Sequence, residues 1–85
     1  MKYETLKSKG TMIAEKDRYR DGGIYVGGYE LWAIGEDLYL HETNTNQLSY
    51  TGKSASTDYI GSSKASHEEL RDLFDKYGIE MIHYL

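Results

Sequence analysis

The clearest periodic pattern in the chain is a helical one over residues 67–77. Apolar side chains recur there at the i, i+3, i+4, i+7 spacing of a single helix face: Leu70, Leu73, Phe74 and Tyr77. Ser66 precedes this stretch, and Glu69 stands three positions after it, as in a capping box that satisfies the first amide groups of a helix. Gly78 suits the left-handed position that ends a helix. The pattern therefore predicts an amphipathic helix with defined ends.

Short alternating stretches separated by turn residues precede that helix. They predict strands at residues 11–15, 24–26, 29–34, 37–42 and 47–51. Residues 16–23 are expected to form a charged turn that ends in Asp21-Gly22-Gly23, and residues 43–46 a polar turn. The pair Gly27-Gly28 predicts a bulge or a second turn, and Gly35-Glu36 predicts a two-residue hairpin turn with glycine first.

The remaining segments carry weaker patterns. Residues 1–10 are expected to be a frayed start or a short edge strand, and residues 52–65 a mobile loop with one short strand. The β-prone residues 79–85 predict a final strand that returns to the sheet. Residues 1–85 are thus predicted to form a single α+β domain. Its small antiparallel meander of about four to six strands carries one amphipathic helix near the C-terminus, followed by a short final strand.

Composition agrees with a small folded domain. The chain has 85 residues, of which 39% are hydrophobic and 28% charged, and a chain this short has a thin core with little room for a deep pocket. Nine tyrosines and one tryptophan stand against one phenylalanine, so most aromatic rings carry a polar group suited to interfaces. The absence of cysteine favours a cytoplasmic, intracellular protein, and no stretch is apolar enough for a signal peptide or a membrane span.

Charge is distributed unevenly along the chain, whose net charge is −4. Residues 1–20 hold six basic and three acidic groups, and residues 21–85 hold four basic and eleven acidic groups. Between Asp21 and Gly52 there is no lysine or arginine, whereas carboxylates accumulate among aromatic residues: Asp21, Glu30, Glu36, Asp37 and Glu42. Such a block would repel a phosphate backbone and attract a basic partner.

The motifs of known chemistry are incomplete. The Gly52-Lys53-Ser54 sequence resembles the end of a phosphate-binding loop, but position 47 is glutamine where that loop needs glycine. The three histidines have no metal-ligand spacing, and the loop serines have no neighbouring base or oxyanion motif. We therefore expect no enzyme activity, no catalytic residues, no metal and no cofactor.

The leading hypothesis from the sequence is a non-enzymatic protein-binding module. Tyrosine and tryptophan would anchor a partner protein with a basic surface, and carboxylates would surround them. The residues expected to bind the partner are Tyr29, Glu30, Trp32, Glu36, Asp37, Tyr39 and Glu42. By analogy only, small acidic domains that occupy a nucleic-acid-binding surface, as phage-borne inhibitors of host defence nucleases of the anti-CRISPR type do, fit this description. The carboxylates would then stand in for phosphates.

A second hypothesis belongs to a different class. Tyrosines could line a cleft for a small ligand, or the chain could be a regulatory domain, with the cleft completed in a homodimer. Neither hypothesis includes direct binding to nucleic acid or to a membrane, because the acidic block disfavours phosphate groups and no apolar segment is long enough.

Overall fold

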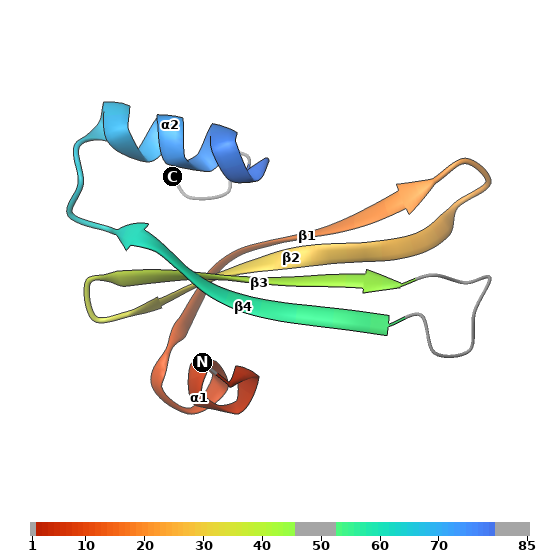
Figure 1. The fold of residues 1–85 in the computed structure, drawn as a ribbon, viewed down its shortest axis with the longest axis horizontal. Helices are drawn as coiled ribbons and strands as arrows, with labels where there is room; N and C mark the ends of the chain where they lie inside the picture. Colours follow the sequence, from red (N-terminus) through yellow and green to blue (C-terminus); the bar gives the residue numbers. More distant parts are fainter. Residues whose placement is uncertain (1, 46–52, 80–85) are drawn as a thin grey trace.

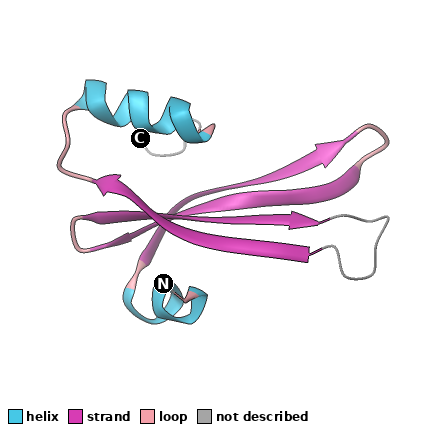
Figure 2. Cartoon of the chain, viewed as in Figure 1, coloured by secondary structure: helices cyan, strands magenta, loops and turns pink. Residues whose placement is uncertain are grey.

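The computed structural model describes residues 2–45 and 53–79 of the chain. Its elements are α1 (Tyr3–Lys9), β1 (Thr11–Arg20), β2 (Ile24–Ile34), β3 (Asp37–Thr45), β4 (Lys53–Ser62) and α2 (His67–Tyr77), shown in Figure 1. The four strands form one antiparallel sheet in the order β1-β2-β3-β4, with a helix at each end of the chain (Figure 2). The predicted α+β class and the antiparallel meander are confirmed.

The sheet is covered by a different helix on each side, so β2 and β3 alternate between two buried environments. Residues that face α2 include Leu31, which lies opposite Leu40, and both are almost completely buried. On the other side Glu30 lies opposite His41, and these residues face α1. We refer to these sides as the α2 face and the α1 face. Successive side chains of a strand point to opposite sides of the sheet, and this alternation separates the residues of the α2 face from those of the α1 face.

The α2 face carries the main hydrophobic core. Leu70 and Phe74 of α2 pack with strand residues from all four strands: Ala14, Tyr29, Leu31, Leu38, Leu40 and Ile60. The helix has the predicted ends, since the Ser66 side chain accepts a hydrogen bond from the Glu69 amide at 3.2 Å and Gly78 has a left-handed φ of 71°. The helix predicted for residues 67–77 is therefore confirmed, including its start and end.

The first ten residues differ from the prediction of a frayed start or an edge strand. They contain α1, which places Leu6 fully buried against the sheet. Its N-cap, Lys2, makes no side-chain hydrogen bond to the helix. Seven residues are too few to show a helical period or to be stable alone, because helix nucleation is costly. Contacts with the sheet are therefore what stabilises this helix.

Other differences concern strand length. Strand β1 continues through residues 16–20, which were expected to be a turn, and the turn is confined to residues 21–23. Strand β2 runs through the Gly27-Gly28 pair, and β3 runs to Thr45. Residues 53–62, expected to be mostly loop, form β4 because pairing with β3 overrides their serine-rich composition. The predicted strand at residues 47–51 lies outside the described residues. So does the predicted final strand apart from Ile79, and α2 is the last element described.

The described part of the chain is elongated, with extents of 41 × 27 × 16 Å. Both helices lie toward the end of the sheet where β2 meets β3, whereas the tip of the β1–β2 hairpin extends past them (Figure 1). Neither helix of residues 2–45 and 53–79 is long and apolar enough to cross a membrane. At one end of the sheet a helix therefore covers each face, and at the other end the strand side chains are exposed.

The side chain that the α2 face depends on most is Phe74, which is fully buried. Phe74→Ala should lower the free energy of unfolding by about 3–5 kcal/mol, because it removes the ring and leaves a cavity. The total stability of a domain of this size is on the order of 4–13 kcal/mol. Urea unfolding followed by circular dichroism measures the change, with Asp75→Ala on the exposed side of α2 as the control. A cost below about 1 kcal/mol would mean that α2 is not packed as described.

Candidate functional site

The structure distributes the predicted partner-binding residues over three places. Tyr29 and Glu42 lie on the α2 face. Glu30, Trp32 and Tyr39 lie on the α1 face, and Glu36 and Asp37 lie at the turn between β2 and β3. Several of these residues are neighbours in sequence, and successive side chains of a strand point to opposite sides of the sheet. They do not form one surface.

Two of the three aromatic residues of that set, Trp32 and Tyr29, are buried. Trp32 is 9% exposed, and its Nε1 donates a hydrogen bond to Glu30 Oε1 at 2.9 Å. Tyr29 is 5% exposed within the core cluster of the α2 face. Burial raises the pKa of Tyr29, and the nearby charges of Lys16 and Arg18 oppose that rise. These rings stabilise the sheet and are not exposed anchors.

Three of the other predicted residues, Glu36, Glu42 and Tyr39, have polar or aromatic partners near the surface. Glu36 lies 2.9 Å from Lys64 Nζ in an exposed ion pair, and Glu42 lies 3.5 Å from Arg18. The ring of Tyr39 packs edge-on against Tyr59 with centroids 5.7 Å apart. Exposed pairs of this kind contribute little to stability.

A cluster on the α1 face holds the carboxylate of Glu30 in place. The hydroxyl of Tyr3 donates a hydrogen bond to Glu30 Oε1 at 2.7 Å, and Trp32 donates to the same oxygen. The Tyr3 ring stacks on His41 with centroids 4.0 Å apart and meets Trp32 edge-on at 6.2 Å. His41 is 7% exposed, and its Nδ1 lies 2.7 Å from Thr57 Oγ1. Helix α1 thus fixes a carboxylate at the edge of a buried aromatic cluster.

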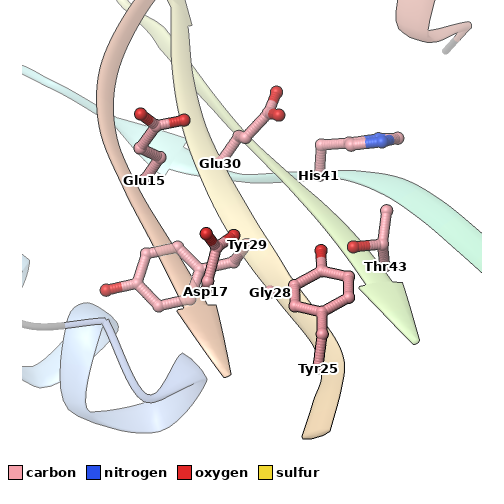
Figure 3. A pocket seen from close by; sticks show the side chains of 8 residues that line it. All are labelled: Glu15, Asp17, Tyr25, Gly28, Tyr29, Glu30, His41 and Thr43. Carbon is pink, nitrogen blue, oxygen red and sulfur yellow. The ribbon is translucent and has the colours of Figure 1, made fainter. Parts of the chain in front are cut away.

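A small pocket opens next to this cluster. Its volume is about 40 Å³, and Figure 3 shows the residues that line it: Glu15, Asp17, Tyr25, Gly28, Tyr29, Glu30, His41 and Thr43. Three of them are carboxylates on the neighbouring strands β1 and β2, with His41 and Thr43 on β3 beyond them. Neither lysine nor arginine is among these lining residues. The pocket therefore carries an acidic surface.

Strand alternation creates this acidic surface by sorting the charges of β1. Glu15 pairs with Glu30 and Asp17 pairs with Gly28, which places both carboxylates on the α1 face. Lys16 and Arg18 alternate with them and face the other side, where Arg18 meets Glu42. A stretch whose charges alternate in sequence is therefore acidic on one side of the sheet and basic on the other.

The Gly27-Gly28 pair shapes the pocket. Gly28 lies between Asp17 and Thr43 in the sheet register, and the missing side chain leaves bare backbone there. A Cβ at Gly28 would overlap the carbonyl oxygen of Lys16, and one at Gly27 would overlap that of Thr43. Next to this pair, Val26 is an extra residue in β2, because Arg18 pairs with Gly27 whereas Tyr19 pairs with Tyr25. The bulge therefore lies next to the Gly27-Gly28 pair, where the sequence predicted a bulge or a second turn.

The bulge also changes which side Tyr25 faces. Without the extra residue, Tyr25 would share the side of Tyr29 on the α2 face. With it, Tyr25 joins Gly28 and Glu30 on the α1 face and lines the acidic pocket. Its ring meets that of Tyr19 edge-on, with centroids 5.7 Å apart, and Tyr19 is 61% exposed.

Five residues thus form one continuous surface, which we call the acidic face: Glu15, Asp17, Tyr19, Tyr25 and Glu30. Carboxylates accept hydrogen bonds and attract cations, so this arrangement suits the ammonium group of lysine or the guanidinium group of arginine. In residues 2–45 and 53–79, no group of three or more acidic or histidine side chains has the arrangement of a metal site.

Sequence reasoning missed four of these five residues. Net charge summed along the chain assigns Glu15 and Asp17 to a basic N-terminal segment, because such a sum does not separate the two faces of a strand. The alternation in Glu15-Lys16-Asp17-Arg18 was the signal that could have separated them, given a strand that continues through residue 20. For Tyr25 the Gly27-Gly28 pair predicted a bulge or a second turn, but only strand pairing places the bulge at Val26 and so turns Tyr25 toward this face.

The chain matches no protein-family model, no curated protein and no solved structure.

The hydrogen bond between Tyr3 and Glu30 affects the ionisation of the Tyr3 hydroxyl. That bond, burial and the charges of Glu30 and Glu15 raise the pKa of Tyr3 from 10.0 to about 12. Because the folded pKa is the higher one, the interaction stabilises the fold fully below pH 10 and is lost as the pH rises through 12. The difference between tyrosinate titrations of wild type and Tyr3→Phe should isolate a late-titrating group.

Glu30→Gln provides the matched control for that titration. It removes the negative charge but keeps an oxygen that can accept the hydrogen bond, so the Tyr3 midpoint should move back toward its ordinary value. If Tyr3 ionises together with the other tyrosines in the wild-type protein, the contact between α1 and Glu30 does not form in solution.

Proposed function

We propose that this chain is a non-enzymatic protein-binding module that docks the acidic face on a basic surface of a partner protein. The observation that carries the proposal is the sorting of Glu15, Asp17 and Glu30 onto one side of the sheet around a pocket. The cations of β1 alternate with these carboxylates and lie on the opposite side. A surface of one sign steers a partner of the other sign and selects its orientation.

Two tyrosines next to the carboxylates supply contact area. Tyr19 is 61% exposed, Tyr25 is 36% exposed, and their rings already pack against each other. Tyrosine is among the residues that most often anchor protein interfaces, and a ring held in place loses little entropy on binding. The acidic face thus combines exposed tyrosines with carboxylates, the combination expected from the sequence but built from other residues.

Position in the fold also supports this surface. The acidic face runs along β1 and β2 from the pocket toward the turn of their hairpin, where Tyr19 pairs with Tyr25. The tip of this hairpin extends past the end of the sheet that the helices cover (Figure 1). At the end of the acidic face nearest the helices, Tyr3 and Trp32 hold the Glu30 carboxylate by hydrogen bonds. A carboxylate that is already oriented loses less side-chain entropy when a cation binds.

A ligand cleft is less well supported by the geometry. The acidic pocket holds about 40 Å³, whereas pockets for drug-sized ligands hold roughly 300–1,000 Å³. A volume of this size suits the end of one side chain, such as a lysine or arginine of a docked protein.

Binding of a fluorescent oligo-arginine peptide, followed by anisotropy at low and high salt, tests the acidic face. The Glu15→Lys plus Asp17→Lys variant should bind about tenfold more weakly or worse, and wild-type binding should weaken as salt screens the charges. The matched control is Glu36→Lys plus Asp37→Lys, which makes the same change in net charge at the β2–β3 turn. It should retain most of the affinity.

Equal losses in the two variants would show that the peptide responds only to net charge, and the acidic face would then not be a binding site. Capture of a partner from lysate by wild type, compared with the Glu15→Lys plus Asp17→Lys variant, then identifies the natural partner. If that partner binds duplex DNA, competition between the DNA and this chain tests the narrower proposal of an inhibitor whose carboxylates replace phosphates.

A further inference from the structure

The two edges of the sheet differ in a way that bears on self-association. Among the described strands, β1 forms one edge of the sheet and β4 the other. An edge strand presents unpaired backbone groups to any second strand. Between residues 15 and 20, five of the six residues of β1 are charged. Between Ala55 and Tyr59, β4 carries one charge, that of Asp58. Charge is a common protection of edges, and β4 largely lacks it.

Pairing of β1 with β1 of a second copy is opposed by its own charge pattern. In an antiparallel pair about a two-fold axis perpendicular to the sheet, both copies present the same side, so a residue meets one that faces the same way. With the axis at Lys16, Glu15 would meet Asp17 and the two Lys16 residues would meet. With the axis at Asp17, Lys16 would meet Arg18 and the two Asp17 residues would meet. Like charges directly opposite each other destabilise a strand pair, and the sorting that makes the acidic face therefore also protects this edge.

The side chains of β4 fit the same symmetry. With the two-fold axis at Thr57, Ala55 of one copy lies opposite Tyr59 of the other, and Ser56 lies opposite Asp58. Tyr59 is 58% exposed, so its ring could cover the small Ala55 side chain, and the serine hydroxyl could donate to the carboxylate. An axis at Asp58 would instead place the two carboxylates together. The run ends at Ile60, the extra residue of a bulge.

We propose that two copies of this chain pair their β4 strands antiparallel about a two-fold axis at Thr57 and form a continuous eight-stranded sheet. Among the described residues β4 pairs only with β3, and its other edge is where the second copy would pair. The axis keeps both acidic faces on one side of the joined sheet, an arrangement suited to a partner with repeated basic sites. The pairing itself does not depend on the function proposed above.

The chain contains no cysteine, so single cysteine variants report the pairing directly. In the proposed register the two Cα atoms at position 57 lie about 4.5–5.5 Å apart, within the range that a disulfide spans. Thr57→Cys should therefore form a covalent dimer under mild oxidation with copper phenanthroline. Ala55→Cys should not, because the two sites would be four residues out of register, roughly 14 Å apart. Lys16→Cys on the opposite edge is the second control.

Mixed oxidation of Ser56→Cys with Asp58→Cys tests the register independently, since it should give a heterodimer in higher yield than either variant alone. This pair also avoids the Thr57 hydroxyl, which lies against His41 in the folded chain. If neither Thr57→Cys nor the mixed pair cross-links more than Lys16→Cys, the β4 pairing is wrong.

Sedimentation of the unmodified protein provides the complementary measurement. Wild type should sediment as a dimer, and Tyr59→Lys should sediment as a monomer because two cations would enter the joined edge. Tyr19→Lys on β1 is the matched control and should remain dimeric. A wild-type protein that stays monomeric at millimolar concentration overturns the proposal, as does a Tyr59→Lys variant that remains a dimer.

Discussion

Strand β2 packs against a helix on each of its two faces, and most of the structure follows from this constraint. Leu31 packs in the hydrophobic core under α2, while its neighbours Glu30 and Trp32 lie under α1 in a layer built from hydrogen bonds and ring contacts. A carboxylate beneath a helix is costly unless donors meet it, and Tyr3 and Trp32 do so. Helix α1, too short to be stable alone, is thereby tied to the central strand.

The same alternation separates charge where the helices no longer cover the sheet. Along β1, acidic and basic residues alternate, so each side of the hairpin has one sign near the pocket. The extra residue Val26 then turns Tyr25 toward the acidic side, and Gly28 leaves the backbone bare between Asp17 and Thr43. A bulge and a glycine therefore convert a plain hairpin into a surface with a pocket, carboxylates and exposed rings.

The helices cover only one end of the sheet, so the residues that stabilise the fold and the residues proposed to bind a partner lie in different parts of the molecule. The core residues that decide folding lie under α2, and the acidic face extends toward the hairpin tip. Changes at Glu15, Asp17 or Tyr19 can therefore alter binding with little effect on the core, whereas Glu30 also holds α1 on the sheet. The edges differ as well, because β1 is protected by its charges whereas β4 is polar and nearly uncharged.

The sequence by itself determined the elements whose signals are local. The α2 helix followed from its apolar spacing, Ser66 and Gly78, and the tight turn from Gly35-Glu36, because caps and turns depend on residues close in the chain. Tertiary structure decided what needs partners distant in sequence. Helix α1 requires the sheet, β4 requires β3, and Tyr25 joins Glu15 and Glu30 only because a bulge is set by pairing with β1. The chemistry of an acidic and aromatic surface was readable from composition, whereas the residues that form it were not, since a strand's faces are assigned only once its register is known.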